Sequence, residues 1–127
     1  MTTEVRAPST PIYLAGEFVE TANALEVRNP ADGSLVGSTF QAGADELERA
    51  TVAAVEAFER TKRMASFERR DVLAHVAARI ERDAEELSVL LSRESGKPIR
   101  DARGEVARAA LTFRIAGEEA TRINGEW

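Results

Sequence analysis

Cysteine is absent from this 127-residue sequence, and histidine occurs once, at His75. Without cysteine, these residues cannot supply a disulfide, a thiolate metal site or a thiol nucleophile. His75 has no cysteine or second histidine to join it in a metal site, so we expect it on the outer surface of a helix. The sequence therefore offers little chemistry of its own.

Long apolar runs and an excess of positive charge are also missing. No segment approaches the roughly 20 apolar residues that span a bilayer, and the N-terminus has no apolar stretch like that of a signal peptide. The net charge is -5, with 22 acidic and 17 basic residues interspersed, so no basic stripe is available to neutralise phosphates. We expect a cytoplasmic protein that binds neither nucleic acid nor membrane.

What is present predicts an α+β fold in which strands precede helices. Residues 1–11 are rich in Thr, Pro and Ser, and we expect a flexible N-terminus there. Residues 12–40 combine β-forming side chains with turn formers and predict a small layer of β-hairpins. Residues 45–122 change to the helical period and predict about four α-helices. Their expected starts are Asp45, Ser66, Asp83 and Pro98.

The third and fourth helices are expected to meet at a glycine. The third would pack through Leu87, Leu90 and Leu91 and end at Gly96, because glycine readily adopts the left-handed conformation that follows many helices. Lys97 comes next, and we expect it to be a solvated cation near the C-terminal end of that helix.

The last helix is expected to be apolar on two sides. Gly104, Leu111 and Ile115 share one side with Arg108. Scattered exposed apolar residues are ordinary, but packing between this domain and a second body would explain both sides. The other, broader side carries Ile99, Ala102, Val106, Ala109, Ala110, Phe113 and Ala116, which we expect to face the preceding helices.

Several short motifs follow one another from residue 12 to residue 126. They are YLAGEFV at 13–19, VRNPADG at 27–33, FERR at 67–70, ESGKP at 94–98, GEV at 104–106 and EEATRINGE at 118–126. No single motif is specific, but in this order and spacing they resemble the N-terminal region of the NAD(P)-dependent aldehyde dehydrogenases. The resemblance implies that residues 12–127 support a cofactor-binding domain and line one wall of a substrate tunnel.

The resemblance also implies an activity for which this sequence lacks the essential groups. Members of the family oxidise an aldehyde by thiolate attack and hydride transfer to nicotinamide, and water activated by a glutamate then releases the thioester. The segments that supply these groups are absent here, as is a glycine-rich phosphate loop. We therefore expect a truncated chain, inactive alone, whose complete enzyme uses NAD or NADP. Its expected partners are a small-molecule aldehyde, the remainder of its own subunit and further copies in a homo-oligomer.

Two sets of site residues follow from the resemblance. Arg108, within GEVAR, resembles an arginine of the branch that acts on phosphonoacetaldehyde, lactaldehyde and glyceraldehyde 3-phosphate. Its planar donor fork suits an anionic tail, and phosphonoacetaldehyde is the favoured substrate. The alternative is a surface ion pair between Arg108 and Glu105. Some members bind a structural Na⁺ or K⁺, whose ligands would be backbone oxygens of Val27 and Arg28 and the carboxylate of Glu94.

A rival hypothesis from another class of protein is a self-contained helical module without catalysis. Such a module would bind a protein partner through the side of the last helix that carries Gly104, Leu111 and Ile115. A gene that continues beyond residue 127 into segments with a cysteine nucleophile and a general-base glutamate would favour the enzyme.

Overall fold

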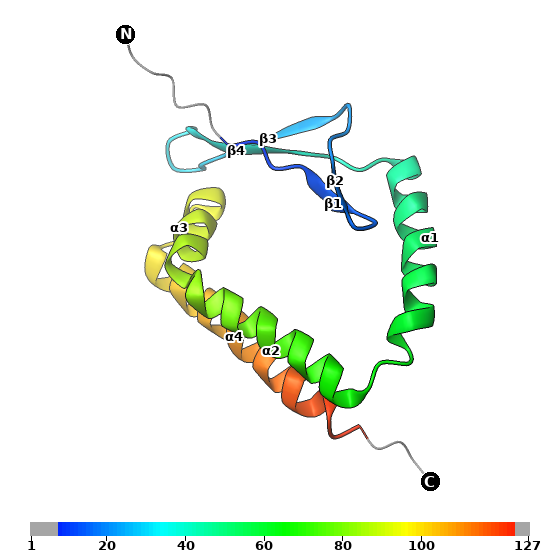
Figure 1. Ribbon diagram of the computed structural model, residues 1–127. Helices are drawn as coiled ribbons and strands as arrows, with labels where there is room; N and C mark the ends of the chain where they lie inside the picture. Colours follow the sequence, from blue (N-terminus) through cyan, green and yellow to red (C-terminus); the bar gives the residue numbers. More distant parts are fainter. Residues whose placement is uncertain (1–7, 124–127) are drawn as a thin grey trace. The chain divides into compact units, whose positions relative to one another are not determined.

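The computed structural model describes residues 8–123. The chain divides into two compact units, one ending at Lys62 and the other beginning at Arg63. Within the described residues, four strands and helix α1 belong to the first unit, and helices α2 to α4 belong to the second (Figure 1). The predicted α+β fold, with strands first and four helices after them, is confirmed. No helix of residues 8–123 is long and apolar enough to cross a membrane.

The strands pair as two separate antiparallel hairpins rather than as one layer. Each hairpin joins strands that follow each other in the sequence, because turn-forming residues lie between them. The pairs are β1 (Ile12–Leu14) with β2 (Glu17–Val19), and β3 (Ala24–Arg28) with β4 (Leu35–Phe40).

The turn between β3 and β4 is formed by residues 29–33, which lie within the VRNPADG motif. The N–H of Gly33 donates to the carbonyl oxygen of Asn29 at 2.8 Å, and the Asn29 side chain accepts the N–H of Ala31 at 3.0 Å. Gly33 has a φ of 72°, which costs glycine little because it has no β-carbon. The turn is therefore encoded locally.

The chain immediately before β1 pairs with β4. The N–H of Thr10 donates to the carbonyl oxygen of Ser38 at 2.9 Å, and the N–H of Ser38 donates to that of Pro8 at 3.0 Å. The segment from Pro8 to Thr10 pairs in this way because the exposed edge of β4 offers free backbone groups, and the flexibility expected for residues 1–11 stays a prediction. The first seven residues of the expected flexible N-terminus lie outside the described residues.

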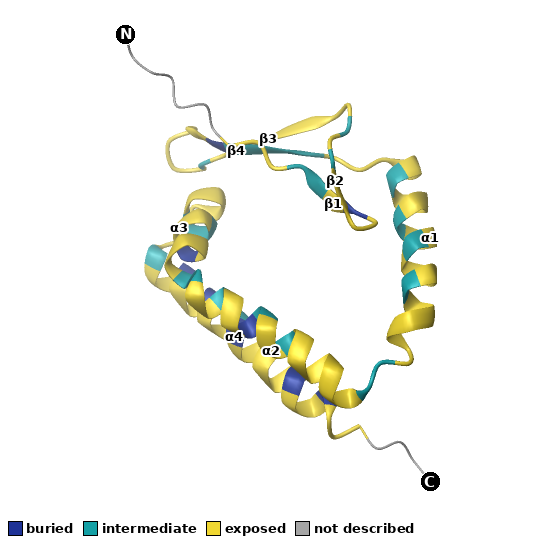
Figure 2. Ribbon diagram, in the orientation of Figure 1, coloured by how far each residue is buried: buried dark blue, intermediate teal, exposed yellow. Residues whose placement is uncertain are grey.

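Helix α1 (Ala44–Thr61) begins one residue before the predicted Asp45. The N–H of Gly43 donates to Oε2 of Glu46 at 2.7 Å, so Glu46 closes the first turn by reaching back to the N-cap residue. No residue of α1 is buried (Figure 2). The apolar side chains of Leu47 and Phe58 are well exposed.

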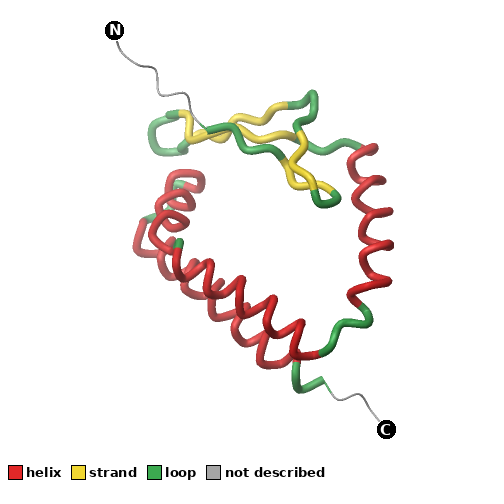
Figure 3. Tube along the Cα trace, viewed as in Figure 1, coloured by secondary structure: helices red, strands yellow, loops and turns green. Residues whose placement is uncertain are grey.

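The second unit consists of three packed helices. α4 runs back along α2, and α3 packs against the first part of α4 (Figure 3). The helices begin within a residue of the predicted starts. They are α2 (Ser66–Arg82), α3 (Ala84–Ser95) and α4 (Ile99–Ala120).

The inner side of α4 differs from the prediction near its C-terminal end. Ala102, Val106 and Ala110 are buried as expected, but Phe113 and Ala116 are exposed and Gly117 is buried instead. Residue 117 is rotated only about 20° from residue 110 around the helix, whereas residue 116 is about 120° away. A β-carbon added at Gly117 would lie 3.5 Å from the backbone oxygen of Arg70, so α2 and α4 approach closely there. Ile99 and Ala109 are half-buried.

The inner side of α3 was also predicted incompletely. Leu87 and Leu90 are exposed and Leu91 is half-buried. Ser88 is buried in their place, and its hydroxyl donates to the carbonyl oxygen of Ala84 at 2.6 Å. Because α3 touches α4 along one narrow stripe, one polar residue on that stripe is buried while leucines beside it are not.

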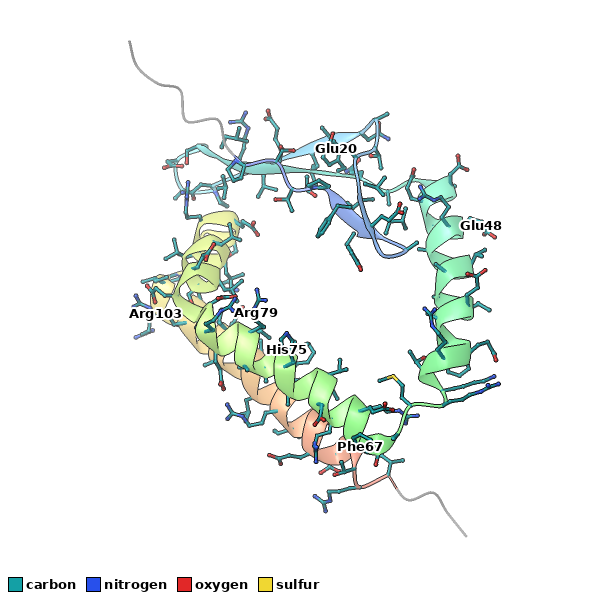
Figure 4. The ribbon with its side chains drawn as sticks, viewed as in Figure 1. Glu20, Glu48, Phe67, His75, Arg79 and Arg103 are labelled. Carbon is teal, nitrogen blue, oxygen red and sulfur yellow. The ribbon has the colours of Figure 1, made fainter. Side chains whose placement is uncertain are left out.

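His75 is exposed on α2, as the sequence predicts. It projects from the same side of the helix as Arg79, one turn further on (Figure 4). Residues 8–123 contain no group of three or more His, Cys, Asp or Glu side chains that could hold a metal ion.

Candidate functional site

The connection between α3 and α4 is held by backbone and hydroxyl hydrogen bonds. Gly96 ends α3 with a φ of 71°, and its N–H donates to the carbonyl oxygen of Ser92 at 2.9 Å. The hydroxyl of Ser92 donates to the carbonyl oxygen of Lys97 at 2.8 Å. Pro98 then precedes the first residue of α4 and fixes the backbone φ at that point. The predicted helix end at Gly96 is confirmed, and the backbone of Lys97 is firmly placed.

Lys97 forms an ion pair with Glu105, which lies on the second turn of α4. Its Nζ donates to Oε2 of Glu105 at 2.7 Å, and the two side chains are 28% and 40% exposed. The prediction that Lys97 is a solvated cation is therefore wrong, because the compact connection places its long side chain within reach of α4. The hydrogen bond from Lys97 is the main reason that the pKa of Glu105 lies below its usual value; desolvation opposes this shift, while the charges of Lys97 and Arg108 support it.

Arg108 is exposed, and no hydrogen bond or ion pair joins its guanidinium to any residue in the range 8–123. The alternative ion pair with Glu105 is not formed, since that carboxylate bonds to Lys97 instead. Arg108 acts on Glu105 only through its charge. The donor fork of Arg108 is thus available to an anionic ligand.

Apolar residues surround Arg108 on the same side of α4, as the sequence predicts. Leu111 and Ile115 are 48% and 49% exposed, and Gly104 has no described atom within 4 Å of the place where a β-carbon would lie. A guanidinium beside exposed apolar side chains can bind a small molecule that carries one anionic group on an apolar body.

A hollow of about 570 Å³ lies beside this side of α4, within the three-helix unit. Val106, Ala110 and Leu111 supply part of its apolar lining. Ion pairs between helices border it: Arg103 donates to the carboxylate of Glu85 at 3.0 and 2.6 Å, and Arg114 pairs with Glu81. The hydrogen bond from Arg103 lowers the pKa of Glu85. No local sequence pattern indicates these pairs, because their partners lie 18 and 33 residues apart.

The residues expected to bind Na⁺ or K⁺ are divided between the two units. Val27 and Arg28 lie in β3 of the first unit, where the pairing with β4 shifts register. The Arg28 side chain donates to the carboxylate of Glu26 and to the carbonyl oxygen of Gly33. Glu94 is exposed in the last turn of α3 in the second unit. Neither unit alone contains all three expected ligands, so the ion site stays a prediction.

Comparison with known proteins gives the context of these features. Residues 18–127 match the model of the aldehyde dehydrogenase family. The 3-sulfolactaldehyde dehydrogenase of Priestia aryabhattai is 36% identical over 126 residues, which are 99% of this chain and 26% of that protein.

Two solved structures are similar to this chain in both sequence and fold. Aldehyde dehydrogenase 21 of Physcomitrella patens, in complex with its reaction product succinate, has a TM-score of 0.91 and 38% identity, covering 96% of this chain and 26% of the other. PnpE in complex with nicotinamide adenine dinucleotide has a TM-score of 0.87 and 38% identity, covering 92% of this chain and 25% of the other. The chain thus spans about a quarter of the length of the relatives that it matches. With its family model matched from β2 onwards, this chain belongs to the aldehyde dehydrogenase family.

Proposed function

We propose that this chain is the front part of an NAD(P)-dependent aldehyde dehydrogenase that oxidises an aldehyde with an anionic tail to its acid. The observation that carries the proposal is the exposed guanidinium of Arg108, which has no partner among residues 8–123 and lies beside Leu111 and Ile115. Family membership supports the oxidation of an aldehyde. The sulfolactaldehyde and succinate in the names of two relatives support an anionic group on the substrate.

In this proposal Arg108 binds and orients the substrate. Its two outer N–H groups would donate to two oxygens of a phosphonate, sulfonate or carboxylate, which fixes the direction of the tail. Leu111 and Ile115 would cover the carbon chain and exclude water from it. Phosphonoacetaldehyde remains the first aldehyde to test, and 3-sulfolactaldehyde and succinate semialdehyde belong to the same chemical class.

In this proposal the oxidised nicotinamide of NAD or NADP would accept the hydride. The sequence has no glycine-rich phosphate loop and no cysteine, so we assign no cofactor-binding or catalytic residue here. The cytoplasmic location, the homo-oligomer and the Na⁺ or K⁺ bound by Val27, Arg28 and Glu94 also belong to the proposal.

The rival function, a binding module without catalysis, is favoured by one observation. Gly104, Leu111 and Ile115 form an exposed apolar strip on α4, and such strips often mark interaction surfaces. In an enzyme the same strip would be covered by substrate and by the remainder of the subunit, so it does not require a separate function.

Substitution of Arg108 in the full-length enzyme that carries this chain tests the proposal. Arg108→Ala removes charge-assisted hydrogen bonds worth about 1.5–3 kcal/mol, so KM for an anionic aldehyde should rise about 10- to 100-fold. KM for a neutral aldehyde of similar size should change little. Arg100→Ala is the matched control, because this arginine lies on the same helix with a side chain that is 91% exposed. Equal effects of Arg108→Ala on both aldehydes would remove Arg108 from the substrate site.

A further inference from the structure

Glu105 lies on α4 between two cations but bonds to only one of them. Arg108 follows it by three residues, a spacing that allows an ion pair on the surface of a helix. The carboxylate nevertheless bonds to Lys97 at 2.7 Å, and no hydrogen bond or ion pair with Arg108 is present in the described chain. Lys97, and not Arg108, is therefore the hydrogen-bonded partner of the Glu105 carboxylate.

The backbone around Lys97 favours this choice. Gly96 turns the chain, and the hydroxyl of Ser92 holds the carbonyl oxygen of Lys97, so the side chain starts from a fixed point. A pre-placed lysine loses less conformational entropy on pairing than a fully solvated one. The Lys97 side chain is 28% exposed, so its apolar stem is partly covered by the protein.

Removal of the Lys97 charge would leave the Glu105 carboxylate without its hydrogen-bonded partner. Arg108 is already close enough to act on Glu105 through its charge, and its flexible side chain can complete the contact. A guanidinium paired in this way must break the ion pair before it binds another anion. The competing contact would weaken anion binding without changing the atoms that touch the substrate.

We propose that Lys97 is a positioning residue that occupies Glu105 and thereby keeps the guanidinium of Arg108 free for the anionic tail of the substrate. This inference rests on the proposed role of Arg108. It assigns a function in specificity to Lys97 of the ESGKP connection. A purely structural ion pair between the connection and α4 would instead affect all substrates alike.

The test compares Lys97→Met in the full-length enzyme with the wild-type enzyme, because methionine keeps the apolar stem and removes the charge. KM for an anionic aldehyde should rise about two- to fivefold, the range for competition by a surface ion pair, with kcat and the KM of a neutral aldehyde unchanged. Lys97→Arg should retain the wild-type KM because it keeps the charge. Arg100→Ala again serves as the control for the loss of a cation from this region.

The decisive variant is the double substitution of Lys97→Met with Glu105→Gln. It removes the competing carboxylate, so KM for the anionic aldehyde should return to the wild-type value, and it avoids an unpaired charge that could impair folding. Failure of this rescue, or equal rises of KM for both aldehydes in Lys97→Met, would overturn the role of Lys97. Arg108→Ala, measured in parallel, separates the role of Lys97 from the proposed function. If Arg108→Ala raises KM for the anionic aldehyde alone, the proposed function stands even when the role of Lys97 fails. If it raises KM for both aldehydes equally, both proposals fail.

Discussion

Replacement of Gly96 by alanine should destabilise the helical unit by about 1–2 kcal/mol. Gly96 has a φ of 71°, and in this left-handed conformation the β-carbon of an L-residue approaches the following carbonyl oxygen, which costs about that amount. The turn cannot relax freely, because the N–H of Gly96 bonds to Ser92 and the next residue, Lys97, bonds to α4. The strain should therefore appear in the free energy of unfolding.

Thermal unfolding followed by far-ultraviolet circular dichroism measures this effect. A loss of 1 kcal/mol lowers the melting temperature of a domain of 60–100 residues by about 4–8 °C, so the expected decrease is about 4–16 °C. Gly104→Ala is the matched control. Gly104 lies inside α4 with nothing within 4 Å of an added β-carbon, so alanine should stabilise the helix by up to about 1 kcal/mol. A Gly96→Ala variant that is as stable as the wild type, or more stable, would refute the argument.

Two further substitutions test the packing and charge of the same unit. Val106 is 8% exposed, and Val106→Ala removes two buried methyl groups. The free energy of unfolding, measured by urea titration, should therefore fall by about 1.5–2.5 kcal/mol. A decrease below about 0.5 kcal/mol would contradict the burial of Val106. Arg103 lowers the pKa of Glu85, so stability from this pair is present above the unfolded pKa of about 4.3 and is lost as the pH falls through the lower folded value. As the pH falls below about 5, the free energy of unfolding of Glu85→Gln should therefore decrease less than that of the wild type. Identical decreases in the two proteins would show that the ion pair does not contribute to stability.

Features set by neighbouring residues in the sequence were predictable. Gly33 and Gly96 both have a positive φ at the points where turn chemistry places them, and each helix begins close to a recognisable start residue. The side of α4 that carries Leu111 and Ile115 is exposed as its helical period indicates. In these cases the controlling interaction spans only a few residues.

Features set by distant residues were not predictable in the same way. Ser88 rather than Leu87 or Leu90 is buried, because the position of α4 decides which stripe of α3 is covered. Lys97 pairs with Glu105 only because the connection folds back toward α4, and a charge pattern alone does not reveal that path. Arg108 was identified from a family resemblance, whereas its lack of a partner became visible only when the partner of Glu105 was known.

Helix α1 spans 18 residues, and the described structure buries none of them. An isolated helix of this length is only marginally stable in water. Its stability therefore depends mainly on capping by Glu46 and on the favourable charges in its first and last turns. Any surface that buries Leu47 or Phe58 would stabilise the helix further, because these apolar side chains are exposed. The helix content of α1 would therefore report association: it would rise when another surface covers Leu47 or Phe58, and it would fall when these side chains stay exposed.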